Sequence, residues 1–106
     1  MTTPKPLREP LDPSRVRTLP KHFAWADHRL RERLAELTPH EIALLFFLHL
    51  SADRQGLSFW ADQTLAKRLN LKEGEVIQAR YGLIHRGFVL YRFPLYQLLP
   101  VGEITP

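Results

Sequence analysis

The residue types that carry most enzyme chemistry are sparse in this chain, and only one pair has a spacing that suggests cooperation. His49 and Asp53 lie four residues apart and could meet on one face of a helix. Such a pair is more often a structural hydrogen bond than a catalytic dyad, and no well-placed nucleophile stands near it. The five histidines lack metal-ligand spacing, and the five glycines form no phosphate loop. We therefore expect no catalysis, no metal site and no cofactor.

Composition and charge narrow the class of protein further. The chain has 106 residues, a formal net charge of +4 and no cysteine, which excludes a disulfide scaffold and a thiol nucleophile. The longest apolar run, from Ile42 to Leu48, is too short to span a membrane, and the N-terminus lacks the apolar core of a signal peptide. We expect one small cytoplasmic domain without membrane contact. Its basic excess suits a nucleic-acid partner.

Residues 1–18 differ from the rest of the chain in composition. Five of the nine prolines lie in the first 20 residues, and few apolar residues accompany them. Proline fixes φ and removes a backbone donor, so residues 1–18 are predicted to form a flexible, Pro-rich basic arm. Its four basic residues are compatible with a solubilising tail or with an arm that contacts a phosphate backbone.

Residues 19–37 are predicted to contain an amphipathic helix from Lys21 to Glu36. Pro20 suits the start of such a helix. Apolar residues recur at spacings of three and four, while the opposite face is charged. This apolar stripe consists of Phe23, Ala26, Leu30, Leu34 and Leu37, with Trp25 beside it.

The clearest boundary in the sequence is the start of a second helix at Thr38. Thr38 and Glu41 have the spacing of a capping box, and Pro39 suits the first helical position. The residues that follow, up to Ala52, are apolar on almost every side, so this helix should be the central and most buried one. Gly56 suits the turn that ends it.

Shorter elements are predicted after that turn. The alternation of Leu57 to Trp60 predicts a short strand. Asp62 should then cap a short helix over residues 63–69. A tight connection at Asn70 and Leu71 leads to the next helix.

The last helix should span about residues 73–86 and should be followed by a hairpin. Gly87 can close the helix as its C-cap. Arg80 should lie at the edge of the buried stripe with its head in water. The apolar segments 88–91 and 95–99 predict a two-stranded hairpin, and residues 101–106 a short tail. The buried stripe of the helix should consist of Val76, Ala79 and Leu83.

This order of elements resembles that of the winged helix-turn-helix family. Residues 63–76 resemble the family's core pattern, in which leucines and an alanine recur around a short turn. Residues 83–89, Leu-Ile-His-Arg-Gly-Phe-Val, resemble the pattern that leads into its hairpin wing. The resemblance implies a mainly α fold with a small β-hairpin, a winged helix-turn-helix over residues 38–100 with an extra N-terminal helix.

Two further segments are similar to small bacterial winged-helix proteins carried by mobile elements or plasmids. They are HFAWADHRL, residues 22–30, and YRFPLYQLL, residues 91–99. In the family, the helix after the turn usually enters the DNA major groove and the wing touches the backbone or the minor groove. The resemblance therefore implies double-stranded DNA binding, sequence-specific or architectural, by a small regulator of transcription or replication.

The resemblance places the DNA contacts on the outward face of the last helix and on its neighbours. Gln78 could pair with adenine, and Glu75 could accept a hydrogen bond from cytosine. Lys67, Lys72 and Arg92 are the preferred phosphate contacts. Each of these side chains could instead be an ordinary solvated residue. The candidate DNA-binding residues are Lys67, Lys72, Glu75, Gln78, Tyr81 and Arg92.

Two acids at the start of this helix speak against DNA binding. Glu73 and Glu75 favour the helix dipole but repel a phosphate backbone. The alternative function is therefore a winged-helix adaptor that binds a protein partner without DNA. Its apolar anchors would be Trp25, Ile77 and Tyr81.

The first predicted helix offers an apolar surface to a second copy of the chain. Phe23, Trp25, Leu30 and Leu34 are the candidate residues for a homodimer or partner contact. Alternatively, the same stripe packs on the core of its own chain. A dimer would place two DNA half-sites about one helical turn apart.

Overall fold

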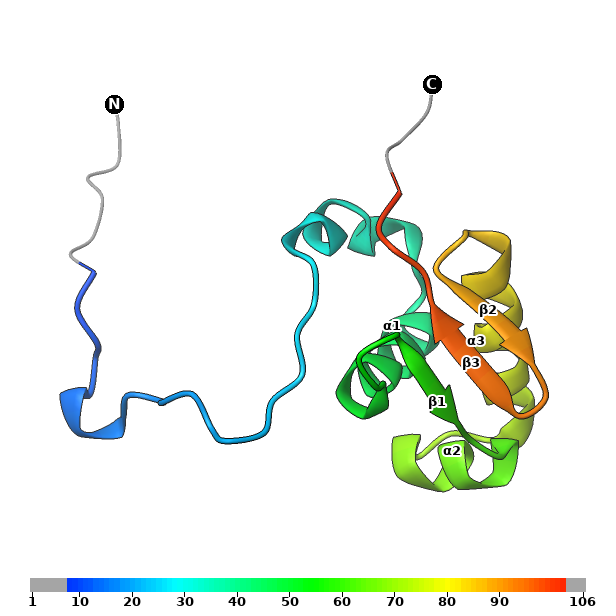
Figure 1. Ribbon diagram of the computed structural model, residues 1–106, viewed down its shortest axis with the longest axis horizontal. Coiled ribbons are helices and arrows are strands. Elements are labelled where there is room, and N and C mark those ends of the chain that lie inside the picture. The colour runs from blue at the N-terminus through cyan, green and yellow to red at the C-terminus, as the bar shows by residue number, and fades with distance from the viewer. Residues whose placement is uncertain (1–7, 103–106) are drawn as a thin grey trace.

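Three helices and a small antiparallel sheet form the folded part of the chain (Figure 1). The computed structural model describes residues 8–102. The elements are α1 (Pro39–Ser51), β1 (Leu57–Phe59), α2 (Asp62–Leu69), α3 (Glu73–His85), β2 (Val89–Arg92) and β3 (Leu95–Leu98). In the described part of the chain, no helix is long and apolar enough to cross a membrane.

Helix α1 begins as its sequence predicts but is not buried on every side. The Thr38 hydroxyl accepts a hydrogen bond from the amide of Glu41, and the Glu41 carboxylate accepts one from the amide of Thr38. The capping box is thus confirmed. The expectation that it would be the most buried helix is not met: α1 and α3 each have four buried residues, because the core covers only one side of α1. Its exposed apolar residues are Ile42, Phe46 and Leu50.

The connection between α2 and α3 is tight. Asn70 takes a left-handed conformation, with φ 55°, which ends α2. The amide of Leu71 then donates to the carbonyl of Ala66 at 2.9 Å. Asp62 does not cap α2 as expected, since Ala61 holds that position without a side-chain bond. The Asp62 carboxylate binds Arg80 instead.

The sheet contains one strand pairing that the sequence analysis did not predict. The expected hairpin is confirmed, with β2 antiparallel to β3 and a turn at Phe93-Pro94. The expected strand at Leu57 is also present, and it pairs with the other edge of β3. The strand order is therefore β1-β3-β2, with the last strand of the chain in the middle.

The core lies between the helices and one face of this sheet. Helix α3 packs against both α1 and α2, and the sheet covers α1 and α3 through β3 and β2. Val76, Ala79 and Leu83 on α3 are buried as predicted. The fully buried large side chains are Tyr96, Leu44, Leu48, Leu65, Leu83, Val76 and Val89.

The predicted amphipathic helix from Lys21 to Glu36 is wrong. Residues 21–27 are extended, and two short 3₁₀ turns, His28–Glu32 and Leu34–Glu36, follow. The Asp27 carboxylate accepts from the amide of Arg29 and so starts the first turn. Of the predicted apolar stripe, Leu37 is in the core and Leu30 packs against it. With only these two residues held by the fold, the stripe lacks the packing that would stabilise a longer helix.

The described part of the predicted basic arm is extended and lies apart from the rest of the molecule (Figure 1, blue to cyan). Its one regular element is a 3₁₀ turn, Pro13–Arg15, which Asp12 caps. The first seven residues of the arm, and residues 103–106 of the predicted tail, lie outside the described part of the chain.

Candidate functional site

Helix α3 presents an open face on the side opposite its buried stripe. Gln78 and Tyr81 are exposed on this face, and Ile77 is half-buried at its border. Glu73, Gly74 and His85 are also exposed. The predicted outward face of this helix is thus confirmed. Its side chains are available to a partner without any movement of the core.

Glu75 has a structural task at the start of α3. Its carboxylate accepts a hydrogen bond from the amide of Lys72 at 2.8 Å and lies 3.7 Å from the ring nitrogen Nε2 of His40. The first contact satisfies one of the backbone donors that every helix start leaves unpaired. The carboxylate that was expected to accept a hydrogen bond from cytosine is therefore already bonded to the backbone at the start of α3.

Three cations that were assigned to phosphate lie at the start of α3 or on the elements that pack against it. Lys67 near the end of α2, Lys72 at the start of α3 and Arg92 at the end of β2 are all exposed. None of them forms an ion pair with another described residue. Together with Arg68 they make four positive charges, compared with the two negative charges of Glu73 and Glu75. The local charge balance is therefore basic despite the acidic helix start.

The hairpin turn lies beside the segment that leads into α2. The amide of Trp60 donates to the carbonyl of Pro94 at 3.1 Å, which links the end of β1 to this turn. Arg92 lies next to the turn, and α2 begins two residues after Trp60. The hairpin turn and the start of α2 thus lie at the same end of the molecule, as Figure 1 shows.

A buried polar cluster around Arg80 holds α3 in place. Its guanidinium binds the carboxylate of Asp62 on α2 and donates to the hydroxyl of Tyr96 on β3 at 3.0 Å. It also lies over the ring of Tyr91, 4.2 Å from the ring centre. The prediction that the Arg80 head reaches water is wrong, because Asp62 and Tyr96 supply the partners that burial requires.

The acid–base properties of this cluster follow from its burial. Burial lowers the pKa of Arg80, but its hydrogen bonds with Asp62 and Tyr96 outweigh that effect, so the pKa is raised. Burial also raises the pKa of Tyr96, against the opposing effect of the bond from Arg80. Sequence analysis missed the cluster because its four residues come from four elements. A charged residue at a stripe position, Arg80 beside Ala79, was the only signal.

A second buried carboxylate joins α1 to α3. Glu41 is buried, and it accepts a hydrogen bond from Nε of Arg86 at 3.0 Å in addition to its capping bond. Its carboxylate lies against the backbone of Gly82, where no side chain stands in the way. This contact joins α3 to α1, and the Arg80 cluster joins it to α2 and the sheet.

The four residues predicted for a dimer or partner surface do not share one surface. Phe23, Trp25 and Leu34 are exposed. Leu30 packs against the core of its own chain, which was the alternative for this stripe. Trp25 is thus available for contact, although it lies on an extended segment and not on a helix.

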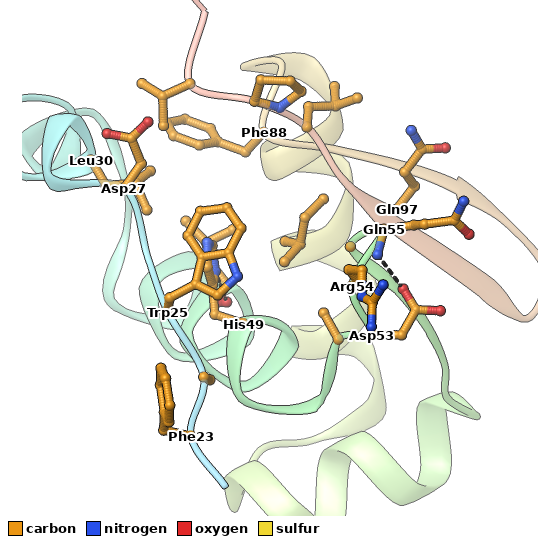
Figure 2. Close-up of a pocket in the computed structure, with 18 residues that line it drawn as sticks. Phe23, Trp25, Asp27, Leu30, His49, Asp53, Arg54, Gln55, Phe88 and Gln97 are labelled. Atoms are coloured by element: carbon orange, nitrogen blue, oxygen red, sulfur yellow. Dashed lines mark hydrogen bonds between the residues drawn. The ribbon is translucent and has the colours of Figure 1, made fainter. Parts of the chain in front are cut away.

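A cavity of about 520 Å³ lies between this extended segment, the end of α1 and the end of β3 (Figure 2). Trp25, Leu30 and Phe88 form its apolar walls. His49 lines it too, but its Nδ1 is bonded to the carbonyl of Leu45 at 2.9 Å. Asp53 accepts from the amides of Gln55 and Leu57. His49 and Asp53 therefore serve the backbone and do not bind each other.

The comparisons with known proteins place the chain in no family. No protein-family model matches it, and neither a curated protein nor a solved structure gives a significant match. Any functional conclusion therefore depends on the chemistry of the surfaces described above.

Proposed function

We propose that residues 38–100 form a winged helix-turn-helix domain that binds double-stranded DNA, in a bacterial regulator of transcription or replication. In this proposal α3 lies in the major groove, and the hairpin turn contacts the backbone. The observation that carries it is the open face of α3, with Gln78 and Tyr81 exposed, together with four cations on α3 and its neighbouring elements that form no ion pair with a described residue. A protein with this role would act in the cytoplasm, without a cofactor.

Roles on the proposed surface differ between side chains. Gln78 is the proposed base contact, because a carboxamide can bind adenine through two hydrogen bonds. Lys67, Lys72 and Arg92 would neutralise phosphates, and the Tyr81 hydroxyl would donate a hydrogen bond to another phosphate. Glu75 is the weakest candidate, because its carboxylate is bonded to the amide of Lys72. A rigid α3, held by Arg80 and Glu41, would present these groups in fixed positions.

A salt titration tests the proposal. Binding of a labelled random duplex should be measurable by fluorescence anisotropy at about 50 mM salt, where the electrostatic contribution is strong. The slope of log affinity against log salt is negative, and its magnitude should decrease by about 0.9 for each phosphate contact removed by Lys67→Ala, Lys72→Ala or Arg92→Ala. Absence of binding at this salt concentration would reject DNA as the partner.

The chain offers a matched control for these substitutions. Arg54 is an exposed cation that forms no ion pair with a described residue. It lies in the turn before β1, at the end of the sheet opposite the hairpin turn. Arg54→Ala should therefore leave the salt slope unchanged. Gln78→Ala should alter the preference among duplex sequences, with the salt slope retained.

A protein-binding adaptor is the second candidate function, and one observation favours it. Tyr81 is a large exposed aromatic on α3, one turn from half-buried Ile77 and about two helical turns from the acids Glu73 and Glu75. Exposed tyrosine is common at protein interfaces. This function predicts no binding in the salt titration, so the same experiment separates the two candidates.

A further inference from the structure

Helix α1 carries a second apolar face that the fold leaves uncovered. Ile42, Phe46 and Leu50 recur every four residues, and their exposed fractions are 37%, 64% and 56%. The core residues of the helix, Leu44, Leu45 and Leu48, lie on the other side. The helix contains no lysine, arginine or aspartate, and its one carboxylate, Glu41, is turned inward. Apart from histidines, its outer side has no ionisable group.

Two aromatic residues of the extended segment enlarge this face. Figure 2 shows Trp25 directly beside His49 of α1, with Phe23 further along the same segment. His49 is three residues from Phe46, so it lies on the neighbouring side of the helix. Trp25 is 74% exposed and Phe23 60% exposed. We call Phe23, Trp25, Ile42, Phe46 and Leu50 together the α1 outer face.

The area of the α1 outer face is close to what a specific interface requires. Large apolar side chains cover about 150–250 Å² each, so the exposed fractions correspond to roughly 600 Å² in total. Single molecules rarely expose an apolar patch larger than this unless it binds something. Two such faces in contact would bury about 1,200 Å², the lower limit for specific protein interfaces.

The residue pattern fits one occupant, a second copy of the chain. Phe46 is midway between Ile42 and Leu50, which lie eight residues or about 12 Å apart along the helix. A two-fold axis near Phe46 would place each Ile42 against Leu50 of the other copy and each Phe46 against its equivalent. Since the α1 part of this face lacks lysine, arginine and exposed carboxylates, no like charges meet where the two copies of α1 touch. We infer that two copies of this chain associate through the α1 outer face.

This association leaves the open face of α3 free in both copies. The α1 outer face lies opposite the residues that pack α1 on the core, and α3 is part of that core. The contact therefore does not compete with the surface proposed for DNA. It differs from the predicted dimer surface, since Leu30 and Leu34 take no part. The inference also stands independently of DNA binding, because it is tested without DNA.

Sedimentation equilibrium tests the inference on the intact chain. An interface of this size is expected to have a dissociation constant on the order of micromolar, so the protein should be dimeric at about 100 µM. The measured mass should then be twice 12.4 kDa. Phe46→Glu should return it to 12.4 kDa with an unchanged circular dichroism spectrum. Phe93→Glu, at a phenylalanine in the hairpin turn that is even more exposed than Phe46, should remain dimeric.

Cross-linking gives a second measurement that does not depend on a destabilising charge. The chain has no cysteine, so Phe46→Cys introduces a unique thiol at the proposed two-fold axis. Mild oxidation should join two copies through it, whereas Phe93→Cys should cross-link far less. A wild-type mass of 12.4 kDa, a dimer that persists in Phe46→Glu, or equal cross-linking of the two cysteine variants would each overturn the inference. The first outcome would also result if another segment of the same chain covered the face.

Discussion

The Arg80 side chain joins its own helix, α3, to three other elements. Its partners, Asp62, Tyr91 and Tyr96, lie on α2, β2 and β3, while Arg80 itself belongs to α3. Such an arrangement costs desolvation, which is offset because the guanidinium is bonded to both Asp62 carboxylate oxygens and to the Tyr96 hydroxyl. The orientation of α3 therefore depends on this polar cluster as well as on apolar packing.

Removal of the Arg80 side chain should be costly. Arg80→Ala leaves the Asp62 carboxylate and the Tyr96 hydroxyl without their partner. We expect a decrease in the free energy of unfolding of about 3 kcal/mol, measured by urea denaturation. Arg68→Ala, at an exposed cation on α2, should change it by less than about 0.5 kcal/mol. Equal effects of the two substitutions would contradict this account of the cluster.

Tyr96 should make stability depend on alkaline pH. Because burial raises its pKa, the folded protein holds the phenolic proton more tightly than the unfolded chain does. The resulting stabilisation is complete below the unfolded pKa, about 10, and is lost as the pH rises through the folded value. Urea denaturation should therefore show an added decline above about pH 10. Tyr96→Phe should reduce this decline, whereas Tyr81→Phe, at an exposed ring, should retain it.

At the scale of elements, the contact between α1 and α3 requires glycine at position 82. A Cβ there would collide with the carboxylate of Glu41, which is buried and held by Thr38 and Arg86. Alanine is favoured over glycine within a helix, so the sign of the substitution depends on whether this carboxylate can move. Its two hydrogen bonds indicate that it cannot move cheaply.

Gly82→Ala and Gly74→Ala form a matched pair on α3. We expect Gly82→Ala to destabilise the protein by about 2 kcal/mol, since the added methyl group forces Glu41 out of its bonds. Gly74 has open space around it, so Gly74→Ala should stabilise the protein by about 0.5 kcal/mol. Thermal unfolding of both variants measures the difference. A stabilised Gly82→Ala variant would show that the carboxylate relocates without cost.

The elements that could be predicted from the sequence are those with local signals. The capping box at Thr38 and the turn at Gly87 depend on neighbouring residues, and both α1 and α3 begin and end near the expected positions. The prediction of a helix from Lys21 was wrong because an apolar stripe stabilises a helix only where other residues cover it. The pairing of β1 with β3 joins residues almost forty positions apart, and no local pattern encodes it.

The candidate site was predictable only in part, for the same reason. Periodicity alone separated the inward and outward residues of α3, so Gln78 and Tyr81 were found. The contacts of Arg80 with Asp62 and Tyr96 join distant elements, so they were not found. The α1 outer face was visible in the sequence as a spacing of four, but whether the core covers one side or both is decided by the whole fold.

At the scale of the whole molecule, the extended N-terminal part should contribute little to stability. The hydrogen bonds of residues 8–20 are confined to the turn around Asp12. A variant that begins at Lys21 should therefore unfold with a free energy within about 0.5 kcal/mol of the full chain. The same variant distinguishes the two roles of the arm. If the arm is only a tail, its removal leaves the salt slope of DNA binding unchanged. If the arm contacts phosphates, its removal reduces the magnitude of that slope.

The central place of β3 has a consequence for synthesis of the protein. Within residues 8–102, β1 and β2 each pair only with β3, at residues 95–98, which the ribosome adds after all the other described elements. A nascent chain that stops before Leu95 has three complete helices and two strand segments with unpaired backbone groups. Tyr96, which fills the core and accepts the bond from Arg80, is missing as well. The sheet and the polar cluster therefore cannot be completed until residues 95–98 have been added.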